Sequence, residues 1–122
     1  MLARVFLGCN DSFCETLRIA FQSQNDFAIC GEAQNGVELI KAAMELLPDL
    51  VILEMALPPL DGFEAAEALK LIMPALPVFL MTERYCLRIE KHALSIGVDG
   101  VFEKTHDLKA LVLNARAVCG LD

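Results

Sequence analysis

The sequence has no tryptophan, one tyrosine, two histidines and no cluster of basic residues. Its 17 acidic side chains outnumber the 10 basic ones, and a net charge of −7 argues against nucleic-acid binding through phosphate neutralisation. The longest uncharged stretch, residues 71–82, is too short to span a bilayer and holds two prolines. The first residues lack the layout of a secretory signal. We therefore expect a cytoplasmic protein that binds neither membranes nor nucleic acids.

The cysteines show no recognisable pattern. Their number is odd and no pair has the CxxC spacing, so we expect neither a disulfide framework nor a zinc site. Two histidines are too few for a histidine-rich metal centre. We interpret the cysteines as small buried side chains in a reducing compartment. They are Cys9, Cys14, Cys30, Cys86 and Cys119.

The apolar content is high enough for a packed core. Hydrophobic residues make up 56% of the 122 residues, which excludes disorder and predicts a single domain over residues 1–122. Short apolar runs alternate about five times with stretches of helical period. The expected strands are residues 5–7, 28–30, 50–53, 78–81 and 100–102. The expected helices are residues 13–21, 37–47, 63–73, 86–96 and 108–118.

Two of the expected strands, residues 50–53 and 78–81, are apolar at every position. This is typical of parallel strands with both faces covered. Parallel strands need crossovers, which the intervening helices supply on both faces. The sequence thus predicts a doubly wound α/β fold, a three-layer sandwich with a five-stranded parallel sheet.

Local signals refine the helix boundaries. Ser12 followed by Glu15 predicts a capping box at the first helix. The second helix is expected to bury a stripe formed by Val37, Ile40, Met44 and Leu47. The pair Asp61-Gly62 is interpreted as a turn and helix-start device rather than a catalytic acid.

Polar residues follow the strands at the end where the cleft of such a fold lies. A carboxylate, a hydroxyl and an ammonium group at one end of a parallel sheet suit recognition of a phosphoryl group and its metal. The candidate residues are Cys9, Asn10 and Asp11 after the first strand, Glu54 after the third, Thr82 after the fourth and Lys104 after the fifth.

With these residues placed, the chain resembles the receiver domain of bacterial two-component response regulators, the CheY-like superfamily. The similarity runs from Arg4 to about Gly120 and rests on the order and spacing of several segments. The resemblance implies a flavodoxin-like (βα)5 fold and a role in phosphorelay signal transduction. The segments are residues 48–53, Pro58 with Asp61-Gly62, residues 81–82 and residues 97–104.

The resemblance also implies a phosphorylation site, of which this sequence keeps only part. Thr82 and Lys104 match the family's hydroxyl and lysine. Cys9 and Asn10 fall where an acidic pair holds Mg²⁺, and Glu54 falls where an aspartate accepts the phosphoryl group. Because Mg²⁺ prefers charged oxygen ligands, we expect weak magnesium binding at most, no other cofactor and no enzymatic activity. The chain is thus interpreted as an atypical receiver, or pseudo-receiver.

Glu54 leaves two interpretations open. Its longer arm can reach Lys104 or Thr82 and partly mimic a phosphorylated aspartate, or it is a drifted residue that makes one ion pair with Lys104. A rival hypothesis is a working phospho-receiver in which Asp11 restores metal binding. Another class, a small-molecule-binding flavodoxin-like module, is less favoured because no glycine-rich phosphate loop is present.

The family's conformational relay is also altered. Val101 occupies the position of an aromatic switch that would work with Thr82, and the neighbouring Phe102 is expected on the opposite face of its strand. Thr105 replaces a proline that usually forms a cis peptide, so this bond is expected to be trans or strained. We expect the domain to bind protein partners, namely a sensor kinase, an output domain or a second copy. Its interaction surface is expected around the fourth helix, the fifth strand and the fifth helix.

Overall fold

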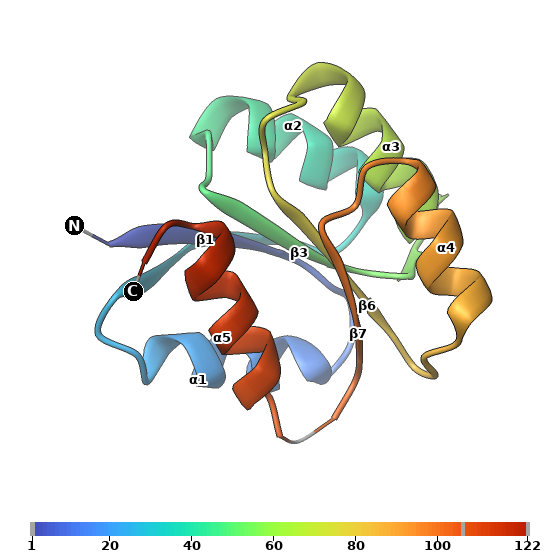
Figure 1. The fold of residues 1–122 in the computed structure, drawn as a ribbon. Helices are drawn as coiled ribbons and strands as arrows, with labels where there is room; N and C mark the ends of the chain where they lie inside the picture. Colours follow the sequence, from blue (N-terminus) through green and yellow to red (C-terminus); the bar gives the residue numbers. More distant parts are fainter. Residues whose placement is uncertain (1, 106, 122) are drawn as a thin grey trace.

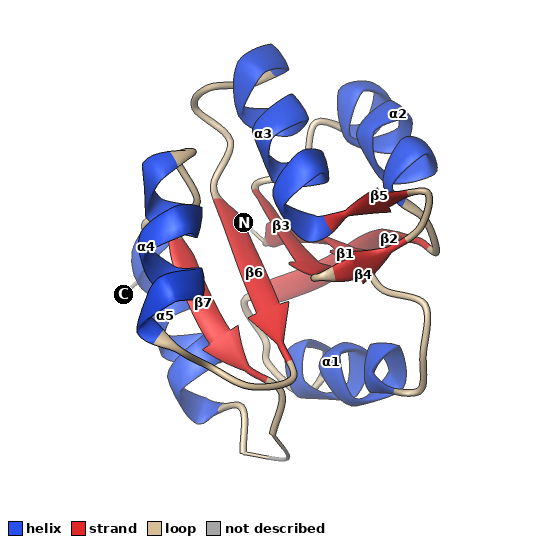
Figure 2. Cartoon of the chain, turned by 90° about the vertical axis from the view of Figure 1, so that its right-hand side faces the viewer, coloured by secondary structure: helices blue, strands red, loops and turns tan. Residues whose placement is uncertain are grey.

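The computed structural model describes residues 2–105 and 107–121 and contains a parallel sheet between two layers of helices (Figures 1 and 2). The sheet has five strands in the order β2-β1-β3-β6-β7, which confirms the predicted fold class. The strands are β1 Ala3–Gly8, β2 Phe27–Ala33, β3 Leu50–Glu54, β6 Val78–Thr82 and β7 Gly100–Glu103, with a small ladder of β4 Ala56–Leu57 and β5 Leu60–Asp61. The helices are α1 Phe13–Gln22, α2 Gly36–Leu46, α3 Gly62–Ile72, α4 Leu87–Ser95 and α5 Lys109–Val118.

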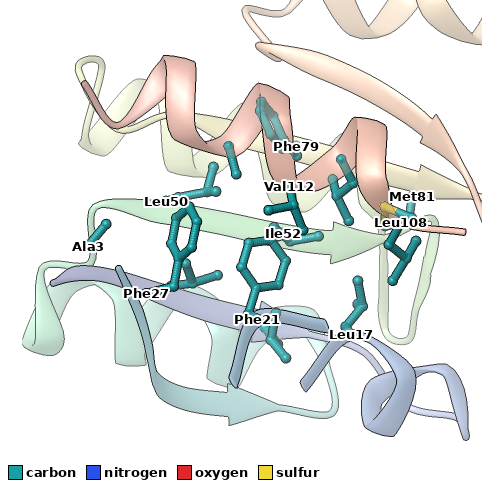
Figure 3. Packing of buried hydrophobic residues seen from close by; sticks show 14 of the residues in the cluster. Ala3, Leu17, Phe21, Phe27, Leu50, Ile52, Phe79, Met81, Leu108 and Val112 are labelled. Carbon is teal, nitrogen blue, oxygen red and sulfur yellow. The ribbon is translucent and has the colours of Figure 1, made fainter. Parts of the chain in front are cut away.

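Each face of the sheet carries its own core. On one face, α1 and α5 bury side chains such as Phe21 and Val112 against the sheet (Figure 3). On the other face, α2, α3 and α4 contribute residues such as Leu39, Leu69 and Ala93. Strands β3 and β6 are buried at all five positions, as their continuous apolar sequence predicts. Full burial of a leucine or phenylalanine side chain contributes about 1.5–3 kcal/mol to folding.

The stripe predicted for α2 is wrong at three of its four positions, because only Ile40 packs against the core. Val37, Met44 and Leu47 are 55%, 51% and 64% exposed, whereas Leu39 and Ala43 are fully buried. The segment carries apolar side chains around most of its circumference, so periodicity alone does not identify the face that packs on the sheet.

The capping box predicted at Ser12 is also wrong. The Ser12 side chain makes no capping hydrogen bond at the start of α1. Asp11 takes this role instead, because its Oδ1 accepts a hydrogen bond of 2.9 Å from the backbone N–H of Phe13. Asp11 therefore belongs partly to the first turn of the helix.

A complete capping box is found at α3. Asp61 Oδ1 accepts from the backbone N–H of Glu64 at 2.8 Å, and the Glu64 carboxylate accepts from the N–H of Asp61 at 3.0 Å, which confirms the interpretation of Asp61. The next residue, Gly62, lies so close to the end of β3 that an added Cβ would be 2.7 Å from the carbonyl oxygen of Glu54. Only glycine fits there, so the Asp61-Gly62 pair fixes α3 against Glu54.

No helix within residues 2–105 and 107–121 is both long and apolar enough to cross a bilayer. The only cis peptide bond in the same residues joins Pro58 and Pro59, so the bond between Lys104 and Thr105 is trans. Of the two expectations for the bond before Thr105, trans or strained, the trans bond is confirmed.

Candidate functional site

Lys104 is the centre of an ion-pair cluster at the carboxyl end of the sheet. Its Nζ lies 2.5 Å from Oε2 of Glu54, at the end of β3, and 2.9 Å from Oδ2 of Asp11, in the β1–α1 loop. A third carboxylate, that of Glu83, lies 3.2 Å away, and the ring centroid of Phe13 lies 5.5 Å from Nζ. The structure thus brings together three of the residues that the sequence singles out, from the β1–α1 loop, the end of β3 and the residue after β7.

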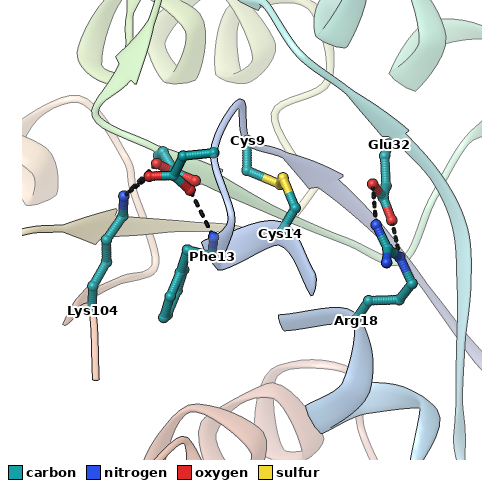
Figure 4. Close-up of a disulfide and its surroundings, with 8 residues drawn as sticks. Cys9, Phe13, Cys14, Arg18, Glu32 and Lys104 are labelled. Atoms are coloured by element: carbon teal, nitrogen blue, oxygen red, sulfur yellow. Dashed lines mark hydrogen bonds and ion pairs between the residues drawn. A yellow bond between two sulfur atoms is a disulfide. The ribbon is translucent and has the colours of Figure 1, made fainter. Parts of the chain in front are cut away.

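Two further residues of the cluster, Glu83 and Phe13, are not predicted as members of the site from the sequence. Glu83 directly follows Thr82 at the end of β6, so its place in the chain was the only signal for it. Phe13 begins α1, and its ring faces the lysine (Figure 4). A cation over an aromatic face adds roughly 0.5–2 kcal/mol.

The cluster is unevenly buried, which shifts the pKa values of its members. Glu54 is 2% exposed, and its burial raises the pKa to about 7, although the ammonium of Lys104 opposes this shift. Burial alone would lower the pKa of Lys104, but its hydrogen bonds with Glu54 and Asp11 outweigh burial and raise it. For Asp11, burial acts to raise the pKa, yet the hydrogen bond from Lys104 and further interactions bring it below its ordinary value.

These shifts predict a pH dependence of stability. Because Glu54 binds its proton more tightly in the folded chain than at its ordinary pKa of 4.5, the free energy of unfolding falls as the pH rises from about 4.5 to 7. The substitution Glu54→Gln removes the titrating carboxyl group. The difference in unfolding free energy between the variant and wild type is therefore expected to shift in favour of the variant by on the order of 3 kcal/mol as the pH rises from 4.5 to 8. Urea unfolding of both proteins at several pH values measures the difference. If the unfolding free energies of the two proteins changed with pH in parallel, the raised pKa of Glu54 would be contradicted.

Cys9 forms a disulfide with Cys14, against the expectation that the cysteines are free (Figure 4). The bond joins the end of β1 to the first turn of α1, where the Cα atoms are 5.7 Å apart. The turn that starts the helix brings together residues five positions apart, a pairing that the CxxC criterion does not cover. The neighbouring Asn10 is exposed to solvent.

Thr82 is buried at the end of β6 and belongs to a tightly held loop. Its Oγ1 donates a hydrogen bond of 3.2 Å to the carbonyl oxygen of Arg84. One residue further, the backbone N–H of Tyr85 donates to the carboxylate of Glu103 at 2.8 Å. The loop between β6 and α4 is therefore bonded to β7 through Glu103, and to Lys104 through the ion pair with Glu83.

Val101 and Phe102 lie on opposite faces of β7, as their alternation in the strand predicts. Val101 packs against the core under α2, α3 and α4. Phe102 packs against the other core, with its ring centroid 4.9 Å from that of Phe79. Phe102 is therefore a core residue and does not replace an aromatic side chain at position 101.

Comparison with known proteins agrees with this arrangement. Residues 10–116 match the family of response regulator receiver domains. The response regulator protein VraR of Staphylococcus aureus is 33% identical over 99 residues, which cover 78% of this chain and 47% of VraR. The chain therefore spans about half the length of the curated relatives it matches.

Two solved structures share the fold. A two-component response regulator of the LuxR family from Aurantimonas sp. SI85-9A1 superposes with a TM-score of 0.91 at 23% identity, covering 98% of this chain and 86% of its own. The response regulator domain of Thermotoga maritima CheB gives a TM-score of 0.88 at 25% identity, covering 100% and 99%. Taken together with the match over residues 10–116, the strand order and the position of Lys104 after β7, this chain belongs to the response regulator receiver domains of two-component signalling.

Proposed function

We propose that this receiver domain works without being phosphorylated. The observation that carries the proposal is the ion pair of 2.5 Å between Glu54 Oε2 and Lys104 Nζ. In the family the lysine contacts the phosphoryl group, whereas here its ammonium is already engaged by an internal carboxylate. Drift and mimicry through Lys104 both include this ion pair, and each leaves the site without an aspartate acceptor.

The donor atoms near Glu54 also argue against magnesium. Mg²⁺ needs nearly octahedral oxygen coordination, usually with one or two carboxylates. At the positions of the acidic pair, Cys9 offers a sulfur held in a disulfide and Asn10 an exposed amide. The two oxygens of Asp11 accept hydrogen bonds from Lys104 and from the N–H of Phe13. These residues do not fit the ion, so no step of the proposed function uses it.

We propose that this domain signals through contacts with other proteins. Receiver domains act by binding proteins such as kinases and output domains, and we propose a sensor kinase, an output domain or a second copy as partners of this one. The expected surface comprises α4, β7 and α5. Because the loop before α4 is bonded to β7 and Lys104, we expect this surface to keep one shape.

Exposure to a small phosphodonor tests the proposal. Wild type and the Glu54→Asp variant are incubated with acetyl phosphate and Mg²⁺, beside a receiver domain that carries the complete acidic set as a positive control. Intact mass spectrometry is expected to find the phosphoryl mass on the control alone, because Cys9 and Asn10 still provide no magnesium site in the single variant. A phosphoryl adduct on the wild-type chain would overturn the proposal.

A further inference from the structure

Two sulfur atoms and a carboxylate lie together beneath the β1–α1 loop. The Sγ atoms of Cys9 and Cys14 and an oxygen of Glu54 all lie within 4.8 Å of one another. Cys9 and Glu54 are buried and Cys14 is half-buried. They come from the end of β1, the first turn of α1 and the end of β3, so the positions of their backbones are set by the fold.

Glu54 presents an unpaired oxygen in this cluster. Oε2 is bonded to Lys104, but Oε1 is buried and has no hydrogen-bond partner. An unpaired buried polar atom costs roughly 1–3 kcal/mol, more when it is charged. A positive ligand at this place would remove that cost, which is a sign of binding that is independent of the cysteines.

The donor types select the kind of ion. Thiolates, with a carboxylate as third ligand, suit Zn²⁺, whose usual ligand pairs include the C-x4-C spacing of Cys9 and Cys14. Two thiolates and Glu54 would give Zn²⁺ three negatively charged ligands, while Lys104 is shared by Glu54, Asp11 and Glu83. A cavity of about 280 Å³ is lined by both cysteines and gives access from solvent.

We propose that Cys9, Cys14 and Glu54 bind one Zn²⁺ ion when the disulfide is reduced, with water as fourth ligand. The disulfide form does not bind it, because its sulfurs are neutral and joined to each other. Where the family holds a hard cation with oxygen ligands, this chain would hold a thiophilic one. The site goes beyond the proposed function, which does not depend on it.

The test starts from the reduced full chain. A phosphine reductant opens the disulfide: it takes the oxygen of one water molecule to become the phosphine oxide, and the two hydrogens pass to the two sulfurs. Zinc affinity is then measured by competition with a chromophoric chelator. Replacing zinc by Co²⁺ adds a second readout, since sulfur-to-cobalt charge-transfer absorption reports the number of bound thiolates.

Matched variants separate this site from the other cysteines. The variant with Cys30→Ser, Cys86→Ser and Cys119→Ser keeps Cys9 and Cys14 as its only cysteines. Like wild type, it is expected to bind one Zn²⁺ when reduced. In this background Cys14→Ser is expected to abolish the two-thiolate cobalt spectrum. Glu54→Gln is expected to weaken zinc binding at least about tenfold, since loss of outer-shell partners alone costs roughly 10–100-fold. Circular dichroism confirms folding of each variant.

The outcomes are distinct. One zinc per reduced chain, lost in the Cys14 variant and absent from the disulfide form, would support the proposal. No binding by a folded, reduced wild type, or binding that survives Cys14→Ser or is equal in the disulfide form, would overturn it. An unchanged affinity in Glu54→Gln would overturn the role of the carboxylate. None of these results depends on phosphoryl labelling, so the two proposals can fail separately.

Discussion

Replacing Cys9, Asn10 and Glu54 together by aspartate is expected to give a chain that takes up a phosphoryl group, in contrast to the wild-type behaviour proposed above. The three carboxylates supply the oxygen ligands that Mg²⁺ prefers. The shorter side chain at position 54 also withdraws from Lys104 by one methylene, which leaves room for the phosphoryl group between them. After incubation with acetyl phosphate and Mg²⁺, intact mass spectrometry is expected to find one phosphoryl mass on most chains of the triple variant.

Two partial variants identify which change matters. Glu54→Asp alone and the pair Cys9→Asp with Asn10→Asp are both expected to stay unlabelled, because each lacks either the metal ligands or the acceptor. The two partial variants and the triple variant are compared at equal folding, judged by circular dichroism. Labelling of Glu54→Asp alone to the extent of the triple variant would show that the metal ligands are not the missing element.

Removing the positive charge of the cluster is expected to cost the most stability. In Lys104→Met, Glu54 keeps its burial but loses its counter-charge, and breaking a buried ion pair in this way costs about 3–5 kcal/mol. The loss is expected in full at pH 8. It is smaller at pH 5, because a carboxyl group with a raised pKa is protonated there and needs no partner. Urea unfolding at the two pH values measures both quantities.

Two comparisons check that the effect belongs to the ion pair. Adding Glu54→Gln to Lys104→Met is expected to recover most of the loss at pH 8, since no buried charge is then left unpaired. Lys41→Met, at an exposed lysine of α2, is expected to change stability by less than about 0.5 kcal/mol. Equal losses for Lys104→Met at both pH values would argue that the lysine acts only by packing.

The fold was predictable because its central strands carry strong local signals. The apolar runs at residues 50–53 and 78–81 leave no polar face, so they have to lie inside a sheet covered on both sides. The stretches between them have helical period and lengths that suit crossovers. The face of α2 was not predictable in the same way, because this helix carries apolar side chains around most of its circumference.

Three members of the candidate site, Asp11, Glu54 and Lys104, could be predicted from the sequence, but the bonds between them could not. Asp11, Glu54 and Lys104 each follow or end a parallel strand, and the carboxyl ends of parallel strands lie at one edge of the sheet. Which carboxylates reach the ammonium depends on side-chain rotamers and on burial, so Glu83 was missed. The disulfide was missed because a helical first turn brings Cys14 back to Cys9, a contact that sequence separation alone does not specify.

The bonds of the loop between β6 and α4 have a consequence for how a cell would use the chain. Thr82, Glu83 and Tyr85 are each bonded to a neighbouring group, so under the proposed function we expect the surface that follows to be displayed in one arrangement whenever the protein is present. If no covalent mark alters that surface, a partner responds only to how many copies it meets. The cell would then control the response of the partner through the rates at which the protein is made and degraded.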